Sequence, residues 1–264
     1  MRITSWNFLH GQRLNPGDER SLESVINSLD SDLLALQEID FNLERSARAN
    51  QPDEIATAMA APHWGFAATV RGTPGFFWRA LKPAEQIVIT STAEEISGSY
   101  GIAIASKLPV AHWLRLELGK SLIGMPLLIA NEKGEVAPFY VKDEPRVALA
   151  AVLECGWTVV NTHLSFVPLV NIYQLFKVTR WAKKLEREFS TKVILLGDFN
   201  LPWGIPVRLT RWLRATNALS YPSWKPAISF DYILVNERDK ESATEVVTPL
   251  APISDHRPIS IDIN

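Results

Sequence analysis

Asp198 and Asn200 directly follow an apolar run, residues 193–196, and a glycine. An uninterrupted apolar run of this length is typical of a strand that is buried on both faces. Because residues two apart on extended backbone point the same way, the acid and the amide would reach into one site, where they could hold a metal ion or a water. Gly, Asp and Asn are also common turn residues, so this segment alone fits an ordinary turn equally well.

The same chemistry recurs at the ends of other apolar segments. Further predicted strands begin or end on an amide, an acid or an imidazole, and the residues concerned are Asn7, Glu38, His163, Asp231 and the pair Asp255 and His256. Chance accounts for one or two such cases. Their number predicts a site that is assembled from several strand ends.

The residue types narrow the chemistry of this predicted site. Carboxylate and amide oxygens are hard ligands that suit Mg²⁺ or Mn²⁺. The sequence has no cysteine cluster and no histidine pair at helical spacing, which argues against structural zinc. It also lacks a Gly-rich phosphate loop and a G-x-S-x-G elbow. Metal-assisted attack by water remains, and a phosphoester is the substrate that fits best.

Short strands and a few helices are predicted to position these residues. Strands fit residues 2–8, 32–37, 102–106, 146–153, 158–161, 192–196, 231–235 and 259–263. Helical spacing of apolar residues predicts helices over 19–29, with Asp18 as the N-cap, over 53–61 and over 169–188. Strands outnumber helices and do not alternate with them strictly, so packed sheets flanked by helices are favoured over a doubly wound parallel sheet.

Two segments, 71–99 and 119–144, are less regular and hold glycine and proline. The first contains Phe76, Phe77 and Trp78, which fit an exposed binding surface and a buried core equally well.

The composition is that of a globular protein without an overall basic field. The chain has 264 residues, 47% of them hydrophobic and 21% charged, and a formal net charge of −2. This charge gives no general attraction to nucleic acid or to anionic membranes, although a local basic patch is compatible with it. The single cysteine, Cys155, excludes an intrachain disulfide and is predicted to be a small buried residue. A leader pattern and a spanning apolar run are both missing, which predicts a cytoplasmic protein with no integral membrane segment.

Seven segments in this order resemble the motifs of the endonuclease/exonuclease/phosphatase superfamily, the Mg²⁺-dependent group that includes pancreatic deoxyribonuclease, bacterial AP endonucleases, sphingomyelinases and inositol-polyphosphate 5-phosphatases. They lie at residues 5–7 (SWN), 36–38 (LQE), 101–110 (GIAIASKLPV), 161–164 (NTHL), 197–200 (GDFN), 230–234 (FDYIL) and 254–258 (SDHRP). The resemblance runs from Ser5 to Ile263. It implies one domain over residues 1–264, with an α/β fold in the form of a four-layer αββα sandwich of two packed mixed sheets flanked by helices.

The resemblance also implies roles for the acids and amides. Glu38 would be the principal ligand of Mg²⁺ or Mn²⁺, with Asn7 beside it and Asp255 near the metal. Asp198 would deprotonate or align the attacking water. Asn200 would orient that water or donate to the phosphate.

The two histidines of the motifs, His163 and His256, would donate hydrogen bonds to phosphate oxygens as charge builds up in the transition state. Such a histidine needs an acceptor on its other nitrogen. Asp255 is adjacent to His256 and on extended backbone would point away from it, so Asp231 is the better partner. A carboxylate partner also raises the pKa of the imidazole and favours its donating form. Arg146, Tyr100 and Trp224 are further candidates for substrate contacts.

The substrate class is less well defined by these motifs. AP endonucleases of the superfamily usually follow the Gln-Glu of the second motif with Thr-Lys, whereas this chain has Ile39 and Asp40. The near-neutral charge also argues mildly against a processive nuclease. A small or lipid-like phosphoester is therefore favoured over nucleic acid, and a nuclease is the alternative. A silent binding domain on the same scaffold is disfavoured because every polar motif position is retained.

Overall fold

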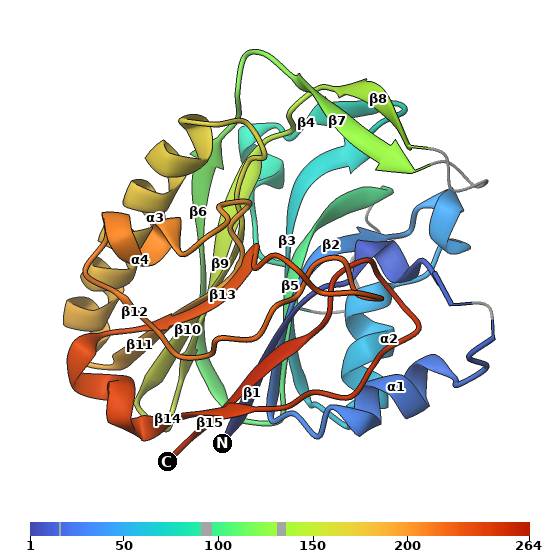
Figure 1. Cartoon of the computed structure of the whole chain (residues 1–264). Coiled ribbons are helices and arrows are strands. Elements are labelled where there is room, and N and C mark those ends of the chain that lie inside the picture. Colours follow the sequence, from blue (N-terminus) through green and yellow to red (C-terminus); the bar gives the residue numbers. More distant parts are fainter. Residues whose placement is uncertain (16, 91–96, 131–135) are drawn as a thin grey trace.

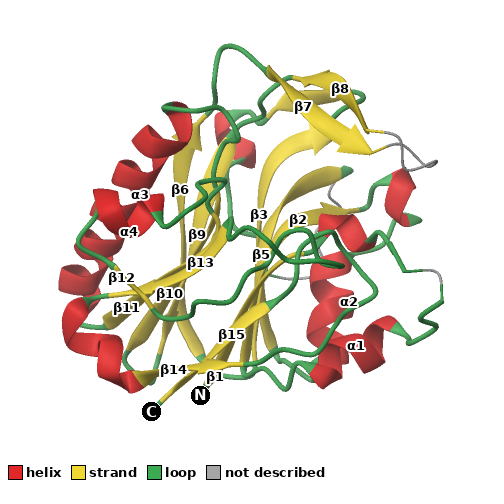
Figure 2. Cartoon of the chain, viewed as in Figure 1, coloured by secondary structure: helices red, strands yellow, loops and turns green. Residues whose placement is uncertain are grey.

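Two β-sheets pack face to face, and helices cover the outer face of each sheet (Figures 1 and 2). The structure is a computed structural model that describes residues 1–15, 17–90, 97–130 and 136–264. The arrangement confirms the predicted four-layer sandwich. Within the described ranges, no helix has the length and apolar character needed to cross a membrane.

The first sheet has the strand order β14-β15-β1-β2-β5-β3-β4. Its strands are β1 (Arg2–Asn7), β2 (Leu33–Phe41), β3 (His63–Gly72), β4 (Trp78–Ala80), β5 (Ser99–Ser106), β14 (Ala243–Val246) and β15 (Ile259–Ile263). Helices α1 (Leu22–Ser28) and α2 (Gln51–Ala58) bury apolar residues against its outer face. Short 3₁₀ turns span Leu9–Gly11, Glu44–Ser46, Pro83–Glu85 and Glu237–Ser242.

The second sheet has the order β12-β13-β11-β10-β9-β6. Its strands are β6 (Val110–Gly119), β9 (Arg146–Leu153), β10 (Trp157–His163), β11 (Lys192–Asp198), β12 (Leu213–Arg214) and β13 (Asp231–Val235). Helices α3 (Val170–Phe189) and α4 (Ile205–Leu209) cover its outer face. Strands β7 (Met125–Ala130) and β8 (Val136–Val141) form a separate two-stranded sheet, at the top of Figure 1.

Asp198, the last residue of β11, and Asp231, the first residue of β13, are paired on neighbouring strands at one edge of the second sheet. In β11, Ile194 and Leu196 enter the core between the sheets, and Asp198 follows at the same two-residue step. In β13, Asp231 precedes the inward Ile233 in the same way. The alternation that builds the core therefore also aims these carboxylates into the space at its edge.

Gly197 lies inside β11 rather than in a turn. Its φ is +133°, and a Cβ at this position would lie 1.9 Å from the carbonyl oxygen of Thr162 in the neighbouring strand. Only glycine permits this backbone conformation and this close approach of β10. The strand therefore continues to Asp198, and an Asx turn follows it, in which Asn200 has a φ of 49° and its N–H donates to Oδ1 of Asp198. The alternative of a strand followed by a turn is therefore compatible with this segment.

A β-bulge in β2 changes the direction of the Glu38 side chain. Leu36 pairs with Ala103 and Ile39 pairs with Gly101, so β2 advances three residues while β5 advances two. The extra residue lets Gln37 and Glu38 share the inward side, while Leu36 and Ile39 both pack on the helical layer. Glu38 adopts a φ of 57°. The strand predicted over 32–37 therefore does not end at Glu38 but continues past it.

Asn161 of β10 joins the two sheets at this bulge. Its buried amide nitrogen donates to the carbonyl oxygens of Leu36 and Ala103, each at 2.9 Å. Its oxygen accepts from the Gln37 amide at 2.7 Å. One side chain thus satisfies two carbonyl groups at the place where the bulge interrupts regular pairing, and it fixes the spacing of the sheets beside Glu38.

Two local predictions are wrong. The helix predicted over 19–29 begins only at Leu22, because Ser21 accepts from the Ser24 backbone and serves as the N-cap. Asp18 instead holds the Arg20 guanidinium at 2.6 Å. Cys155 is exposed rather than buried, because the chain turns outward between β9 and β10. Segments 71–99 and 119–144 contain β4, β7 and β8, and residues 91–96 and 131–135 lie outside the described residues.

Replacing Asn161 by alanine will destabilise the fold. The buried carbonyl groups of Leu36 and Ala103 lose their donor, and each such loss costs about 1–3 kcal/mol. We expect a total loss of about 2–4 kcal/mol in the free energy of unfolding, measured by denaturant titration. Asn236→Ala is the matched control, because the amide of Asn236 bonds a partly exposed carboxylate, and it should cost less than about 1 kcal/mol. Equal costs for the two variants would contradict the bridging role of Asn161.

Candidate functional site

Asp198 lies at the centre of the site. Its Oδ1 accepts the backbone N–H of Asn200 at 2.9 Å, and its Oδ2 accepts the Asn7 amide at 3.1 Å. Its Oδ2 also lies 3.5 Å from Nε2 of His163 and 3.9 Å from Nε2 of His256. Burial, together with the charge of Asp231, raises the pKa of Asp198 to about 6. The carboxylate is therefore ionised at neutral pH yet more basic than an ordinary aspartate.

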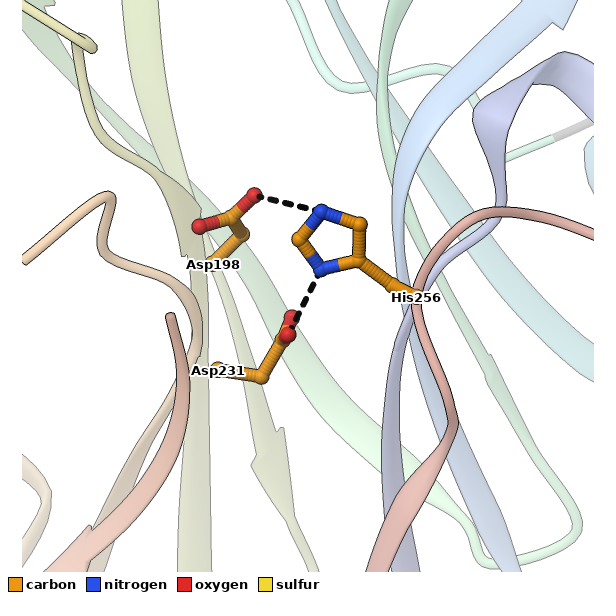
Figure 3. Close-up of side chains that lie close together, drawn as sticks. All are labelled: Asp198, Asp231 and His256. Carbon is orange, nitrogen blue, oxygen red and sulfur yellow. Dashed lines mark hydrogen bonds and ion pairs between the residues drawn. The ribbon is translucent and has the colours of Figure 1, made fainter. Parts of the chain in front are cut away.

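His256 lies between two carboxylates, as Figure 3 shows. Its Nδ1 bonds Oδ2 of Asp231 at 2.7 Å, while its Nε2 faces Asp198. Burial favours the neutral ring, but the charge and the hydrogen bond of Asp231, with added effects of Asp198 and Asp255, raise the pKa of His256 to about 10. At neutral pH the ring is an imidazolium, with one N–H held by Asp231 and the other free to donate across the site.

Glu38 and Asn7 come from neighbouring strands of the first sheet. The Asn7 amide donates to Glu38 at 3.0 Å, and the Asn7 oxygen accepts the backbone N–H of Leu9 at 3.1 Å, which orients the side chain. Burial raises the pKa of Glu38 to about 7, and the negative charges of Asp255 and Asp198 act in the same direction. Several acids thus crowd together on the first-sheet side of the site.

His163 differs from His256 in protonation. Burial, with the nearby positive charges of Arg146 and His256, holds the pKa of His163 well below its usual value, so the ring is neutral. The Asn200 amide donates to the Leu164 carbonyl at 3.0 Å and lies 3.2 Å from Nε2 of His163. Both amide hydrogens of Asn200 therefore have partners, and its side-chain oxygen is the atom left to accept from a water.

Arg146 is buried beside the site, where two carboxylates neutralise it. Its guanidinium lies 2.9 Å from Glu144 and 3.5 Å from Asp143, and its Nε has no hydrogen-bond partner in the described structure. Tyr100 is also buried, with the Arg45 guanidinium 5.5 Å from its ring centre. Both predicted substrate residues lie close enough to influence Glu38 electrostatically.

Trp224 is not brought into this buried cluster, because two thirds of its side chain (67%) is exposed. Tyr221, three residues earlier, packs its ring 5.0 Å from that of His256, and sequence reasoning missed it. The signal was weak, since both aromatic residues belong to one irregular segment. Asn161 was part of a motif, but its bridging contacts depend on β2 and β5 and have no local signature.

The described residues fit a divalent cation at this site. The Oδ1 atom of Asp231 is buried without a hydrogen-bond partner, and Asp198, Asp231 and His256 offer ligand atoms within 4.8 Å of one another. Glu38 and Asp255 add hard oxygen donors, whereas Asn7 turns its amide nitrogen toward Glu38 and has its oxygen bonded to Leu9. Because His256 is protonated and held by Asp231, its ring is a poor metal ligand, which favours the oxygen donors around Glu38.

Asp231→Asn will lower the pKa of His256. In the metal-free protein, loss of the opposite charge at 2.7 Å should reduce this pKa by about 1–3 units, measured by NMR titration of the imidazole carbon-bound protons. Since the pKa is raised above its unfolded value, the ion pair stabilises the fold fully below pH 6.5 and is lost as the pH rises towards about 10. An unchanged His256 titration in the variant would contradict this pairing.

Comparisons with known proteins assign the chain to a family. The model of the Endonuclease/Exonuclease/phosphatase family matches residues 4–256. No match was found among curated proteins.

Several solved structures share the fold. A mannosyl-6-phosphatase of Bacteroides thetaiotaomicron VPI-5482 aligns over 100% of this chain and 99% of its own, with 14% identity and a TM-score of 0.59. The human Nocturnin catalytic domain, solved with bound sulfate, aligns over 100% and 93%, with 17% identity and a TM-score of 0.53. The Haemophilus ducreyi cytolethal distending toxin aligns over 100% and 98%, with 12% identity and a TM-score of 0.53. At these identities the likeness concerns the fold alone. The family match over nearly the whole chain means that this protein belongs to the Endonuclease/Exonuclease/phosphatase family, whose members are generally phosphoester hydrolases that use a divalent metal.

Proposed function

We propose that the protein is a Mg²⁺- or Mn²⁺-dependent phosphoester hydrolase acting on a small or lipid-like substrate. The observation that supports this most directly is the opposed charge state of facing groups. A basic carboxylate, Asp198, and a donor that is protonated at neutral pH, His256, lie 3.9 Å apart in one buried site. Such a pair suits attack by water at one side of a phosphate and stabilisation of charge at the other.

In the proposed mechanism, Asp198 accepts the proton of the attacking water. Asn7 and the Asn200 backbone hold both of its oxygens, so the carboxylate is positioned before substrate arrives. The side-chain oxygen of Asn200 accepts a hydrogen bond from the hydrogen that the water retains, and this bond orients the water. This favours the water-orienting role of Asn200 over direct donation to the phosphate, because its amide hydrogens already have partners.

The histidines stabilise the phosphate. His256 donates its Nε2 proton to a non-bridging oxygen, while Asp231 keeps the ring charged and oriented. Nε2 of neutral His163 accepts the Asn200 amide only when the ring proton is on Nδ1, so the proposed donor role of His163 from Nε2 requires the Asn200 amide to release this atom when substrate binds. Glu38 and Asp255 would hold the divalent cation, and Asn7 would orient Glu38 through the amide hydrogen bond between them. When bound, the cation would supply positive charge to the phosphate oxygens and polarise phosphorus.

The charges around the site favour a compact substrate over a long polyanion. Arg45 is paired with Asp40 at 2.7 Å, and Arg146 is paired with Glu144. These two cations beside the site are therefore already neutralised within the protein. A nucleic acid gains most of its affinity from free cations along its phosphates, which this arrangement does not provide.

Asp198→Asn should reduce hydrolysis of bis-p-nitrophenyl phosphate in Mg²⁺ or Mn²⁺ by about 10²–10⁴-fold, because the amide cannot accept the water's proton. His256→Ala should also be strongly impaired. Asp30→Asn, at an exposed acid, is the control and should match wild type. Equal background rates in wild type and both site variants would contradict an enzymatic role and support a silent binding domain.

Glu38→Gln should weaken Mg²⁺ binding by roughly 100-fold, measured by titration calorimetry, without destabilising the metal-free fold. Burial raises the pKa of Glu38 from 4.5 to about 7, so its ionised form opposes folding above that range, and removing the charge should stabilise the metal-free protein by up to about 3 kcal/mol at pH 8. Glu154→Gln, at an exposed position, is the control. Unchanged Mg²⁺ affinity in Glu38→Gln would contradict the ligand role.

Mg²⁺ affinity of the wild type should fall as the pH drops below about 7. Protons then compete with the cation for the Glu38 carboxylate, whose pKa is about 7. Titration calorimetry at a series of pH values measures the effect, and Glu38→Gln should lose this dependence. A pH-independent wild-type affinity would assign the metal to other ligands.

A substrate panel tests the preferred class. Small phosphomonoesters, phosphodiesters and phospholipid headgroup esters are compared with a labelled abasic duplex and single-stranded oligonucleotides. We expect turnover in the first group. Cleavage of the oligonucleotides alone would identify the protein as a nuclease.

A further inference from the structure

Two turns next to the site carry apolar side chains that project into solvent. In the β3–β4 turn, Phe76 and Phe77 are 88% and 85% exposed, and in the β6–β7 connection, Leu122 and Ile123 are 98% and 67% exposed. Burying such side chains is normally favourable, so this much exposure at neighbouring turns indicates a surface that is covered in use. The connection between β6 and β7 forms the outermost arch of the molecule in Figure 1. We call these four residues the apolar tips.

The β3–β4 turn holds its apolar tip in a defined conformation. The backbone N–H of Phe76 donates to the Thr73 carbonyl at 3.1 Å, and the N–H of Thr73 donates to the Phe77 carbonyl at 2.9 Å. Gly72, at a φ of +97°, permits the close passage of the Phe77 carbonyl. The phenyl rings therefore project from a hydrogen-bonded turn.

The β6–β7 connection is similarly anchored. The Ser121 backbone donates to Oδ2 of Asp143 at 2.6 Å, and the N–H of Ile123 donates to the Ser121 hydroxyl at 3.2 Å. The N–H of Gly124 donates to the Tyr140 hydroxyl at 2.9 Å. Leu122 and Ile123 are thus held outward between fixed residues.

The two tips border one cleft and are flanked by lysines. A cavity of about 380 Å³ is lined by the four tip residues together with Lys120, Lys142 and others. The Lys120 ammonium lies 5.2 Å from the centre of the Trp78 ring, which joins the two turns. The acid that shares this cleft, Asp143, is buried and already bonded to Ser121 and Ser165. The cleft therefore combines protruding apolar groups with exposed positive charge.

This surface is physically connected to the proposed catalytic site. Asp143, which anchors the β6–β7 connection, lies 3.5 Å from the Arg146 guanidinium beside the site. Trp78, at the end of the β3–β4 turn, packs against the cluster that contains Tyr100. A ligand bound by the tips would therefore lie beside residues that flank the proposed catalytic site.

We propose that the apolar tips insert into the surface of an anionic lipid bilayer and hold the site against it. Separate, strongly protruding side chains with adjacent lysines match the acyl region and the anionic headgroups of a membrane. Charge complementarity favours an anionic lipid surface over a second copy of this chain. Although the chain has a net charge of −2, contact between the tips of two copies would bring their lysines together, and these repel one another. That the bound lipid is also substrate rests on the proposed hydrolase function, whereas membrane binding does not.

The test is co-sedimentation of the whole chain with vesicles of phosphatidylcholine alone or of phosphatidylcholine mixed with phosphatidylserine. We expect binding to the mixed vesicles. Phe76→Ser/Phe77→Ser and Leu122→Ser/Ile123→Ser should each weaken it by roughly tenfold or more. Lys120→Glu/Lys142→Glu should weaken binding to the mixed vesicles by roughly tenfold.

Val247→Ser/Leu250→Ser is the matched control, since these apolar residues are 93% and 59% exposed but lie outside the cleft. It should bind like wild type. Thermal unfolding of each variant checks that the fold is kept, and hydrolysis of soluble bis-p-nitrophenyl phosphate should be unchanged in the tip variants. A catalytically inactive wild type that still binds vesicles would refute only the proposed function.

The proposal is overturned if wild type fails to sediment with either vesicle, or if the tip variants bind as well as wild type. Sedimentation velocity distinguishes the other occupant. A wild-type dimer that dissociates in Phe76→Ser/Phe77→Ser, without vesicle binding, would assign the tips to contact between copies.

Discussion

The hydrogen bonds of Asn161 are the constraint on which the site depends. The bulge in β2 turns Glu38 inward. Carbonyl groups of β2 and β5 beside the bulge then need a hydrogen-bond donor from the opposite sheet. By donating to Leu36 and Ala103 and accepting from Gln37, the Asn161 amide meets this need in a region without water access. The sheets are thereby fixed at the edge where the functional side chains of both sheets meet.

Because the side chains are fixed at this edge, the ionisable groups of the site differ in their charge. Burial raises the pKa of Glu38 and that of Asp198, where the charge of Asp231 adds to the effect, while Asp231 keeps His256 protonated. Unlike charge states can coexist at short range because each group has a specific partner on a rigid strand. A bound cation would stabilise the ionised form of Glu38 and of the acids beside it. The charges of the metal-free protein therefore agree with the proposed metal-dependent chemistry.

Beside the site, arginines are paired with carboxylates, and on the nearby surface apolar side chains are exposed. Arg45 and Arg146 are satisfied by their own carboxylates, whereas Phe76, Phe77 and Leu122 face solvent. The paired arginines offer little to a long polyanion, whereas the apolar tips with the exposed Lys120 and Lys142 suit an anionic ligand that has an apolar body. The proposed lipid surface and the proposed preference for a compact or lipid-like phosphoester are thus two consequences of the same distribution of charge and apolar surface.

The sequence by itself determined the packed sheets, eight of the fifteen strands in the described residues and the polar residues at the strand ends, because alternation and apolar runs are local properties of the chain. The long strands β3 and β6 were not predicted from it. Only the tertiary structure decided that β2 bulges at Glu38, that Tyr221 rather than Trp224 contacts His256, and that Cys155 is exposed. It also decided that His256 is charged while His163 is neutral. Protonation and hydrogen-bond partners depend on burial and on charges contributed by segments far apart in the chain, and no local pattern records those distances.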